Sequence, residues 1–191
     1  MNSIIAFDIN RPGWMHPRLP LLPYPIAGLS ACIDDNRLYI IGGYSNGIDK
    51  AASKQVAYLE SGSDHWVHVH PMNIARKFSL ACALDQCIYV MGGDSGSKCT
   101  SLERYDRKTE KWELLVADFG ISISRSDRLT AFDDHIYYLT HSDDANNAAN
   151  ADNNHYYNNY KKYDKSLNEI SSDTCNRDQI LRTVRFIDKS I

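Results

Sequence analysis

Residues 29–43, LSACIDDNRLYIIGG, align without gaps with residues 79–93, SLACALDQCIYVMGG, at an offset of 50 residues. Alanine, cysteine, aspartate, tyrosine and both final glycines recur in register. Self-similarity at a fixed period of this size is the signature of repeat folds, in which each repeat is one supersecondary unit. The sequence therefore predicts a fold built from repeated units of about 50 residues.

Each double glycine is followed by a polar stretch and then by a segment that closes on tryptophan. In the first unit this segment runs from Tyr58 to Trp66, and in the second unit from Tyr105 to Trp112. We expect the two tyrosines to take equivalent places, and likewise the two tryptophans.

A third unit is recognisable in residues 128–141, RLTAFDDHIYYLTH, where Thr140 and His141 replace the double glycine. Ile170 stands where the closing tryptophan is expected. Between them lies an Asn-rich stretch, residues 143–159, whose composition predicts a disordered loop.

The apolar residues come in short runs such as LYII, CIYVM and HIYYL, bounded by Gly, Asn, Asp and Ser. Such runs predict strands, and no window shows sustained helical periodicity. Four short strands in a unit of about 40 to 50 residues are typical of a propeller blade. The sequence therefore predicts an all-β fold.

Residues 71–112 resemble a complete kelch repeat, with a Pro-Met opening, the strand end IYVMGG, the segment ERYD and a closing tryptophan. The resemblance implies a partial kelch β-propeller of about three four-stranded blades, with incomplete blade pieces at both ends. Kelch propellers close with about six blades. The chain is therefore expected to be a partial gene product, a fragment of a longer protein or a degenerate copy.

We divide the chain into five segments. They are the later strands of a partial blade (1–22), repeat 1 (23–70), repeat 2 (71–116), a degenerate repeat 3 (117–172) and a possible opening strand of a further blade (173–191).

The kelch-motif residues are expected to be structural. The glycines would permit sharp turns at strand ends, and the large aromatics would fill the wedge between blades. These residues are Gly42, Gly43, Gly92, Gly93, Tyr58, Trp66, Tyr105 and Trp112.

Composition excludes several classes of function. The net charge of −3 at pH 7 and the lack of a Lys/Arg cluster argue against nucleic acid. No apolar stretch approaches the roughly 20 residues that span a bilayer. The five cysteines form no CxxC pair, so neither a disulfide framework nor a zinc site is indicated. We expect a cytoplasmic protein without cofactors.

Catalysis has no support in the sequence, which lacks a nucleophile elbow and a phosphate-binding loop. His65, His68 and His70 flank Trp66, and two of them could share one face of a strand. A polar outer strand explains them better than a metal site, since no third ligand can be named. Cys32 and Cys82 occupy equivalent apolar positions and are expected to be small core residues.

Arg76 is the candidate for partner binding, with Arg125 at the corresponding place in the third unit and Ile26 in the first. In kelch adaptors, the loops on one face of the propeller hold an acidic peptide, so the resemblance implies that these arginines bind a partner. The alternative is a structural arginine that donates to carbonyls of the next blade. The sequence leaves both open.

The resemblance implies a protein-binding module similar to the substrate-recognition part of BTB-kelch adaptors of cullin-RING ubiquitin ligases. A cullin could be reached only through a BTB domain, which this chain does not contain. A protein that binds actin or another cytoskeletal partner is one alternative. A kelch-type enzyme, such as a sugar isomerase or oxidase, is another, although the copper ligands of such oxidases cannot be mapped onto this chain.

Overall fold

The computed structural model describes residues 20–24, 26–45, 49–120, 123, 127–141, 158–163 and 169–175. The predicted blade pieces at the two ends lie mostly outside these residues, as does most of the Asn-rich stretch, although a strand begins at Asn158. The chain forms two compact units, residues 1–122 and 123–191. We describe each unit by itself.

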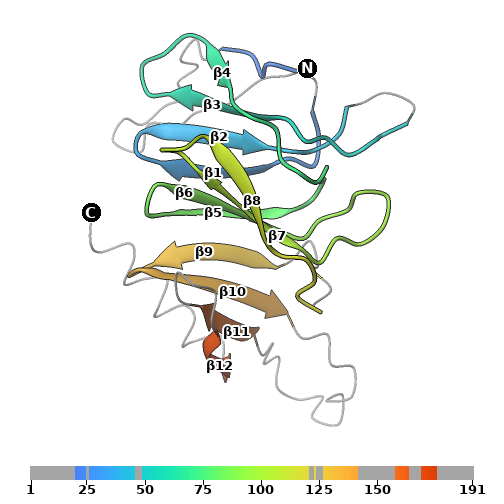
Figure 1. The fold of residues 1–191 in the computed structure, drawn as a ribbon, viewed down its shortest axis with the longest axis vertical. Helices are drawn as coiled ribbons and strands as arrows, with labels where there is room; N and C mark the ends of the chain where they lie inside the picture. Colours follow the sequence, from blue (N-terminus) through green and yellow to red (C-terminus); the bar gives the residue numbers. More distant parts are fainter. Residues whose placement is uncertain are drawn as a thin grey trace, which may run out of the picture. The chain divides into compact units, whose positions relative to one another are not determined.

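The described residues form three antiparallel four-stranded sheets without a helix (Figure 1). Sheet 1 contains β1 (Ser30–Asp34), β2 (Arg37–Ile41), β3 (Val56–Glu60) and β4 (Trp66–His68). Sheet 2 contains β5 (Leu80–Leu84), β6 (Cys87–Met91), β7 (Leu102–Asp106) and β8 (Lys111–Val116). Sheet 3, in the second unit, contains β9 (Arg128–Phe132), β10 (His135–His141), β11 (Asn158–Tyr163) and β12 (Glu169–Cys175). The predicted all-β fold with three four-stranded blades is confirmed.

Each sheet is a meander in which consecutive strands pair. The three sheets lie within the three predicted repeats, although β12 extends to Cys175, beyond the expected end at residue 172. The segment boundaries themselves stay a prediction.

Two-residue turns join the first two strands of every sheet. Both turn residues have positive φ in each case: Asp35-Asn36 (47° and 61°), Asp85-Gln86 (51° and 63°) and Asp133-Asp134 (47° and 60°). This is the backbone of the tight hairpin turn whose twist matches that of the flanking strands. Asp and Asn tolerate it better than other residues with a side chain.

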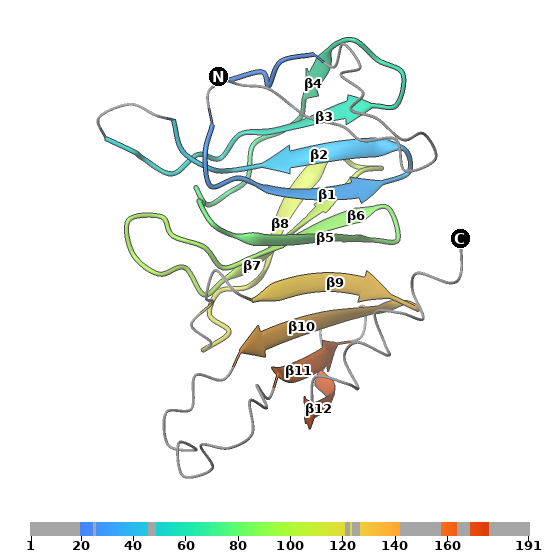
Figure 2. The same ribbon diagram turned by 180° about the vertical axis from the view of Figure 1, so that it is seen from behind.

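Sheets 1 and 2 pack face to face within the first unit, and β1 contacts β5 (Figures 1 and 2). Sheet 1 contributes Tyr39, Ile41 and Val56 to the buried cluster, while sheet 2 contributes Ile88, Val90 and Tyr105. Fully burying one such aliphatic side chain stabilises the fold by about 1.5–3 kcal/mol. This layer is therefore the principal core of the first unit.

The register shows that Tyr58 and Tyr105 are not equivalent. Tyr58 pairs with Tyr39 on the neighbouring strand, whereas Tyr105 pairs with Ile88. A one-residue offset reverses the face of a strand, so Leu59 is the counterpart of Tyr105. Tyr58 and Tyr105 nevertheless meet in the same layer, since one comes from sheet 1 and the other from sheet 2.

The two tryptophans occupy equivalent positions in their sheets, but only Trp112 lies on a sheet face that packs in the layer between sheets 1 and 2. Trp112 packs against the core between the sheets, with its ring 5.2 Å from that of Tyr105, and its indole N–H donates to the carbonyl of His70 at 2.8 Å. Trp66 pairs with Leu59 on the opposite face of sheet 1. Its buried indole nitrogen has no acceptor within the described part of the chain.

Candidate functional site

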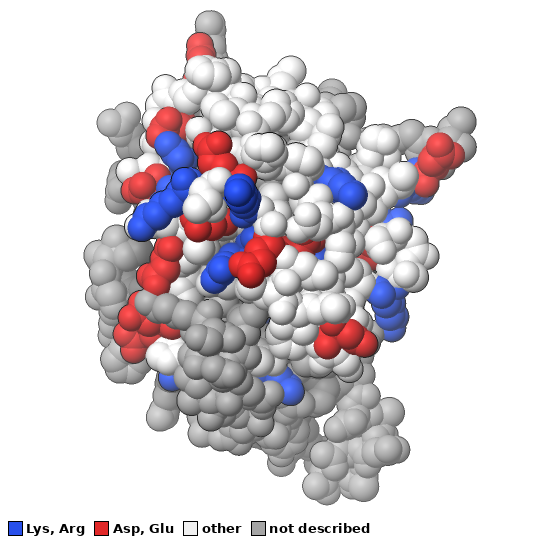
Figure 3. Space-filling view, viewed as in Figure 1, with Lys and Arg blue, Asp and Glu red and all other residues white. Residues whose placement is uncertain are grey.

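The first unit has two ends of different character. The short hairpin turns lie at one end, which we call the turn end. The longer connections, residues 42–55, 69–79 and 92–101, lie at the other end, which we call the loop end. Figure 3 shows acidic and basic side chains mixed on the surface of this unit. Loops carry binding residues more often than the strands that they connect, so the loop end is the first candidate for a binding surface.

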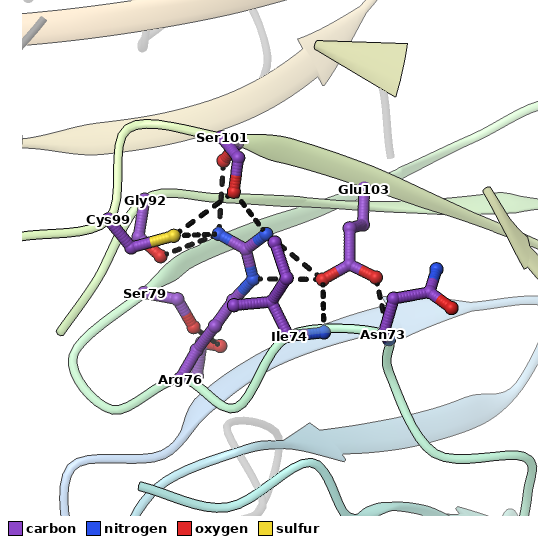
Figure 4. Close-up of polar contacts among 9 residues, drawn as sticks. Asn73, Ile74, Arg76, Ser79, Gly92, Cys99, Ser101 and Glu103 are labelled. Atoms are coloured by element: carbon purple, nitrogen blue, oxygen red, sulfur yellow. Dashed lines mark hydrogen bonds and ion pairs between the residues drawn. The ribbon is translucent and has the colours of Figure 1, made fainter. Parts of the chain in front are cut away.

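Arg76 lies at the loop end with its side chain fully buried (Figure 4). Its guanidinium donates to the carbonyls of Gly92 (2.8 Å) and Ser101 (3.0 Å), and to the Ser101 hydroxyl (2.7 Å). Cys99 Sγ lies 3.1 Å from Nη1. These are the contacts of an arginine that organises a loop.

The carboxylate of Glu103 on β7 balances the positive charge of the Arg76 guanidinium. Arg76 Nε and Nη2 donate to its Oε1 at 3.2 and 3.0 Å, and neither side chain is exposed. The carboxylate also accepts the backbone N–H groups of Asn73 (2.7 Å) and Ile74 (3.1 Å). The pair therefore ties the connection between the sheets to β7, and a fully hydrogen-bonded pair meets the condition under which buried charges are tolerated.

Within the described residues, the Arg76–Glu103 pair has no counterpart in sheet 1 or sheet 3. The register places Ala57 in sheet 1 and Lys161 in sheet 3 at the position of Glu103, while Ile26 aligns with Arg76. Arg125 lies outside the described residues. Glu103 is the first residue of the sequence segment ERYD, but its pairing with Arg76 could not be identified without the strand register.

Beside Arg76, three side chains form a half-buried cluster at the loop end, which we call the aromatic–lysine cluster. The rings of Tyr44 and Phe78 lie 5.7 Å apart, and Lys77 Nζ lies 5.7 Å from the centre of the Tyr44 ring. Lys77 also lies 3.5 Å from Asp94. Its ammonium also donates to the carbonyl of Lys50 at 3.3 Å, so an acidic ligand at this cluster would share Lys77 with Asp94.

Phe78 has an unusual backbone, with φ of +57°. Gly28, at the matching position of the first unit, has φ of +60°, and the Phe78 ring would contact a Cβ placed there at 2.7 Å. Bulky residues rarely adopt this conformation, which costs about 1–2 kcal/mol. In this conformation the Phe78 ring packs beside Gly28 and Tyr44, and the Phe78 N–H donates to the carbonyl of Gly28 at 2.7 Å.

The cysteines at the equivalent repeat positions are core thiols. Burial raises the pKa of the Cys32 thiol to about 12, with a smaller contribution from the Asp34 carboxylate, and burial also raises that of Cys82. Thiols react as thiolates, so a raised pKa disfavours reaction of either cysteine near neutral pH.

We expect neither Cys32 nor Cys82 to react with a thiol reagent at pH 8 in the folded protein, and both to react in urea. Thiol titration with and without denaturant, on variants in which the other cysteines are replaced by serine, tests this expectation. Rapid labelling of Cys82 without denaturant would contradict its place in the core.

The three histidines do not converge on one point. His65 contacts Asp64, with 2.9 Å between Nδ1 and the carboxylate, and the His68 ring packs 5.8 Å from that of Tyr24. Within the described ranges, no three His, Cys, Asp or Glu side chains are placed to hold a metal ion. Nor do these ranges contain a helix that is long and apolar enough to cross a membrane.

A scan of known families matches residues 75–116 to the Kelch motif, a range that includes all of β5–β8. A putative F-box/kelch-repeat protein of Arabidopsis thaliana is 40% identical over 90 residues, 47% of this chain and 22% of that protein. Kelch-like protein 40 of Xenopus laevis is 29% identical over 59% of this chain and 18% of its own length. A kelch repeat and BTB domain-containing protein of cowpox virus is 30% identical over 56% of this chain and 19% of its own length.

The chain thus spans about a fifth of the length of these relatives. The family match and the relatives agree with the repeat, the double glycines and the four-stranded sheets. Residues 75–116 therefore contain a Kelch motif, and the chain resembles the kelch-like proteins.

Proposed function

We propose that the loop end of the first unit binds an acidic segment of a partner protein. The kelch motif and the kelch-like relatives support a protein-interaction module. The observation that carries the choice of surface is the aromatic–lysine cluster, because Phe78 keeps a strained backbone beside Tyr44 and Lys77.

The loop end also favours an acidic partner by its charge. Its connections contain four lysines against two acidic residues: Lys50, Lys54, Lys77 and Lys98, with Asp49 and Asp94. A surface with an excess of one charge speeds encounter with partners of the opposite charge and selects among them.

Arg76 has a structural role in this proposal, because its side chain is fully buried and paired with Glu103. It would support binding indirectly by holding the connection that contains Lys77 and Phe78. We infer no catalytic step, and the names of the relatives given above refer to repeats and domains.

The wider role that we propose is selection of a protein substrate in the cytoplasm for a ubiquitin ligase. A relative named for both kelch repeats and a BTB domain supports this role. Any contact with a cullin would require a BTB domain. A pull-down of cullin by a BTB-containing form, and not by the chain alone, would test it.

We expect Lys77→Glu to weaken binding of an acidic peptide about tenfold, since reversing a charge at the rim of an interface replaces attraction with repulsion. Fluorescence anisotropy with a labelled library of acidic peptides provides the measurement, and added salt should weaken the wild-type complex. The control is Lys111→Glu, an exposed lysine of β8 at the turn end. Equal losses for both variants would contradict the assignment to the loop end.

A further inference from the structure

Lys77 lies at a position where the two repeats of the first unit differ in charge. The offset of 50 residues matches Ala27 with Lys77, and it matches Tyr44 with Asp94, each of which follows a double glycine. Both pairs form the same backbone bridge, with two hydrogen bonds of 2.9 Å between Ala27 and Tyr44, and of 3.0 and 2.8 Å between Lys77 and Asp94. The second repeat therefore has a lysine and an aspartate where the first has two uncharged residues.

The ammonium group of Lys77 is already in use within the chain. Its Nζ lies 5.7 Å from the centre of the Tyr44 ring, donates to the carbonyl of Lys50 at 3.3 Å, and lies 3.5 Å from the Oδ2 atom of Asp94. The Lys77 side chain is 19% exposed and that of Asp94 is 43% exposed. An acidic ligand thus meets an ammonium group that a more exposed carboxylate of the same chain already contacts.

The Asp94 carboxylate is held in place by bonds that a ligand does not replace. Its Oδ1 atom accepts the N–H of Gly96 at 2.7 Å, which forms an Asx turn, while Oδ2 faces Lys77. The backbone bridge to Lys77 fixes the same residue from the main chain. Asp94 therefore stays beside Lys77 when a ligand arrives, and two like charges placed side by side repel each other.

We propose that Asp94 is a built-in competitor that limits the affinity of the loop end for acidic ligands. Its carboxylate takes part of the attraction of Lys77 and repels a second carboxylate at the same ammonium group. This inference rests on the function proposed above, and it adds the residue that sets the strength of that binding. It also predicts an effect of the opposite sign to that of Lys77→Glu.

The test removes the charge of Asp94 and keeps its turn. Asp94→Asn preserves the size of the side chain, and its amide oxygen can still accept the N–H of Gly96. We expect acidic peptides to bind this variant about two- to fivefold more tightly in fluorescence anisotropy, an effect of the size that a partly exposed ion pair can exert. The gain should disappear when Lys77 is replaced by glutamine, because the two side chains contact each other.

Asp118 provides the matched control. Its Oδ1 atom accepts the N–H of Gly120 at 2.7 Å, so it forms the same kind of turn, and the residue is exposed. Asp118→Asn changes the net charge of the chain by the same amount and should leave peptide binding unchanged. Circular dichroism should show that both variants fold as the wild type does.

A second measurement needs no ligand. Brief acetylation with an N-hydroxysuccinimide ester, followed by mass spectrometry, reports how readily the Lys77 ammonium group is reached. We expect faster acetylation of Lys77 in Asp94→Asn than in the wild type, and no change in Asp118→Asn. Acetylation that Asp94→Asn does not change would contradict the contact between Asp94 and Lys77.

The outcomes separate this inference from the proposed function. If acidic peptides bind the wild type and Lys77→Glu weakens them, but Asp94→Asn brings no gain, the competitor role of Asp94 is overturned and the binding function stands. Equal gains in Asp94→Asn and Asp118→Asn would also overturn it, because they would reflect net charge alone. If no acidic peptide binds either the wild type or Asp94→Asn, both the binding function and the competitor role fail.

Discussion

Replacing Glu103 with glutamine should lower the free energy of unfolding by about 3–5 kcal/mol, the usual cost of removing one partner from a buried ion pair. The substitution keeps the size of the side chain but leaves the Arg76 guanidinium without a compensating charge. Neither side chain is exposed, so solvent cannot compensate. Urea denaturation followed by circular dichroism measures the change.

The control for this loss is a pair formed by neighbouring residues of sheet 2. Arg104 and Glu113 approach to 2.7 Å, but their side chains are 33% and 60% exposed. Exposed pairs contribute about 0.2–1 kcal/mol, so Glu113→Gln should have a small effect.

A double-mutant cycle with Arg76→Met should show that the combined loss is smaller than the sum of the single losses, because the two groups contact each other. Two results would show that the Arg76–Glu103 pair does not hold the connection between the sheets. One is an equal loss of unfolding free energy in Glu103→Gln and Glu113→Gln, and the other is additive losses in the double-mutant cycle.

We expect Gly42→Ala to destabilise the first unit by about 2–4 kcal/mol. Two effects combine in this estimate, namely the positive φ of +62° and a steric collision. A Cβ at this position would lie 2.4 Å from the carbonyl oxygen of Arg76, which also accepts the N–H of Gly43. Thermal and chemical unfolding of the variant would give the value.

Gly120 offers a matched control for this substitution. Its φ is +66°, but no atom lies within 4 Å of a Cβ placed there. Gly120→Ala should therefore cost only about 1–2 kcal/mol from the backbone conformation. A Gly42→Ala variant that is no less stable than the Gly120→Ala variant would show that the close approach of Arg76 is not needed.

The fold could be predicted because its determinants recur in the sequence. The offset of 50 residues aligned both double glycines and the strands beside them, and the structure has strands at those places. The Asp-Asn, Asp-Gln and Asp-Asp turns also carried a readable signal, since each joins two apolar runs and both residues adopt positive φ.

The candidate site was less accessible to prediction because it depends on register. Tyr58 and Tyr105 are each the tyrosine that precedes a tryptophan, but Tyr58 lies eight residues before Trp66 and Tyr105 seven before Trp112. The register accordingly places them on opposite faces of their strands. The partner of Arg76 is Glu103, and no local pattern links two residues on different segments. The positive φ of Phe78 could not be predicted from the sequence either, because a phenylalanine does not indicate this conformation.

The loop end of the first unit is the surface that we propose to bind a protein partner. The most direct measurement is hydrogen–deuterium exchange of the chain with and without the tightest-binding acidic peptide. We expect slower exchange in residues 42–55, 69–79 and 92–101, with unchanged exchange in the turns at 34–37 and 84–87. Protection at the turn end, with none at the loop end, would contradict it.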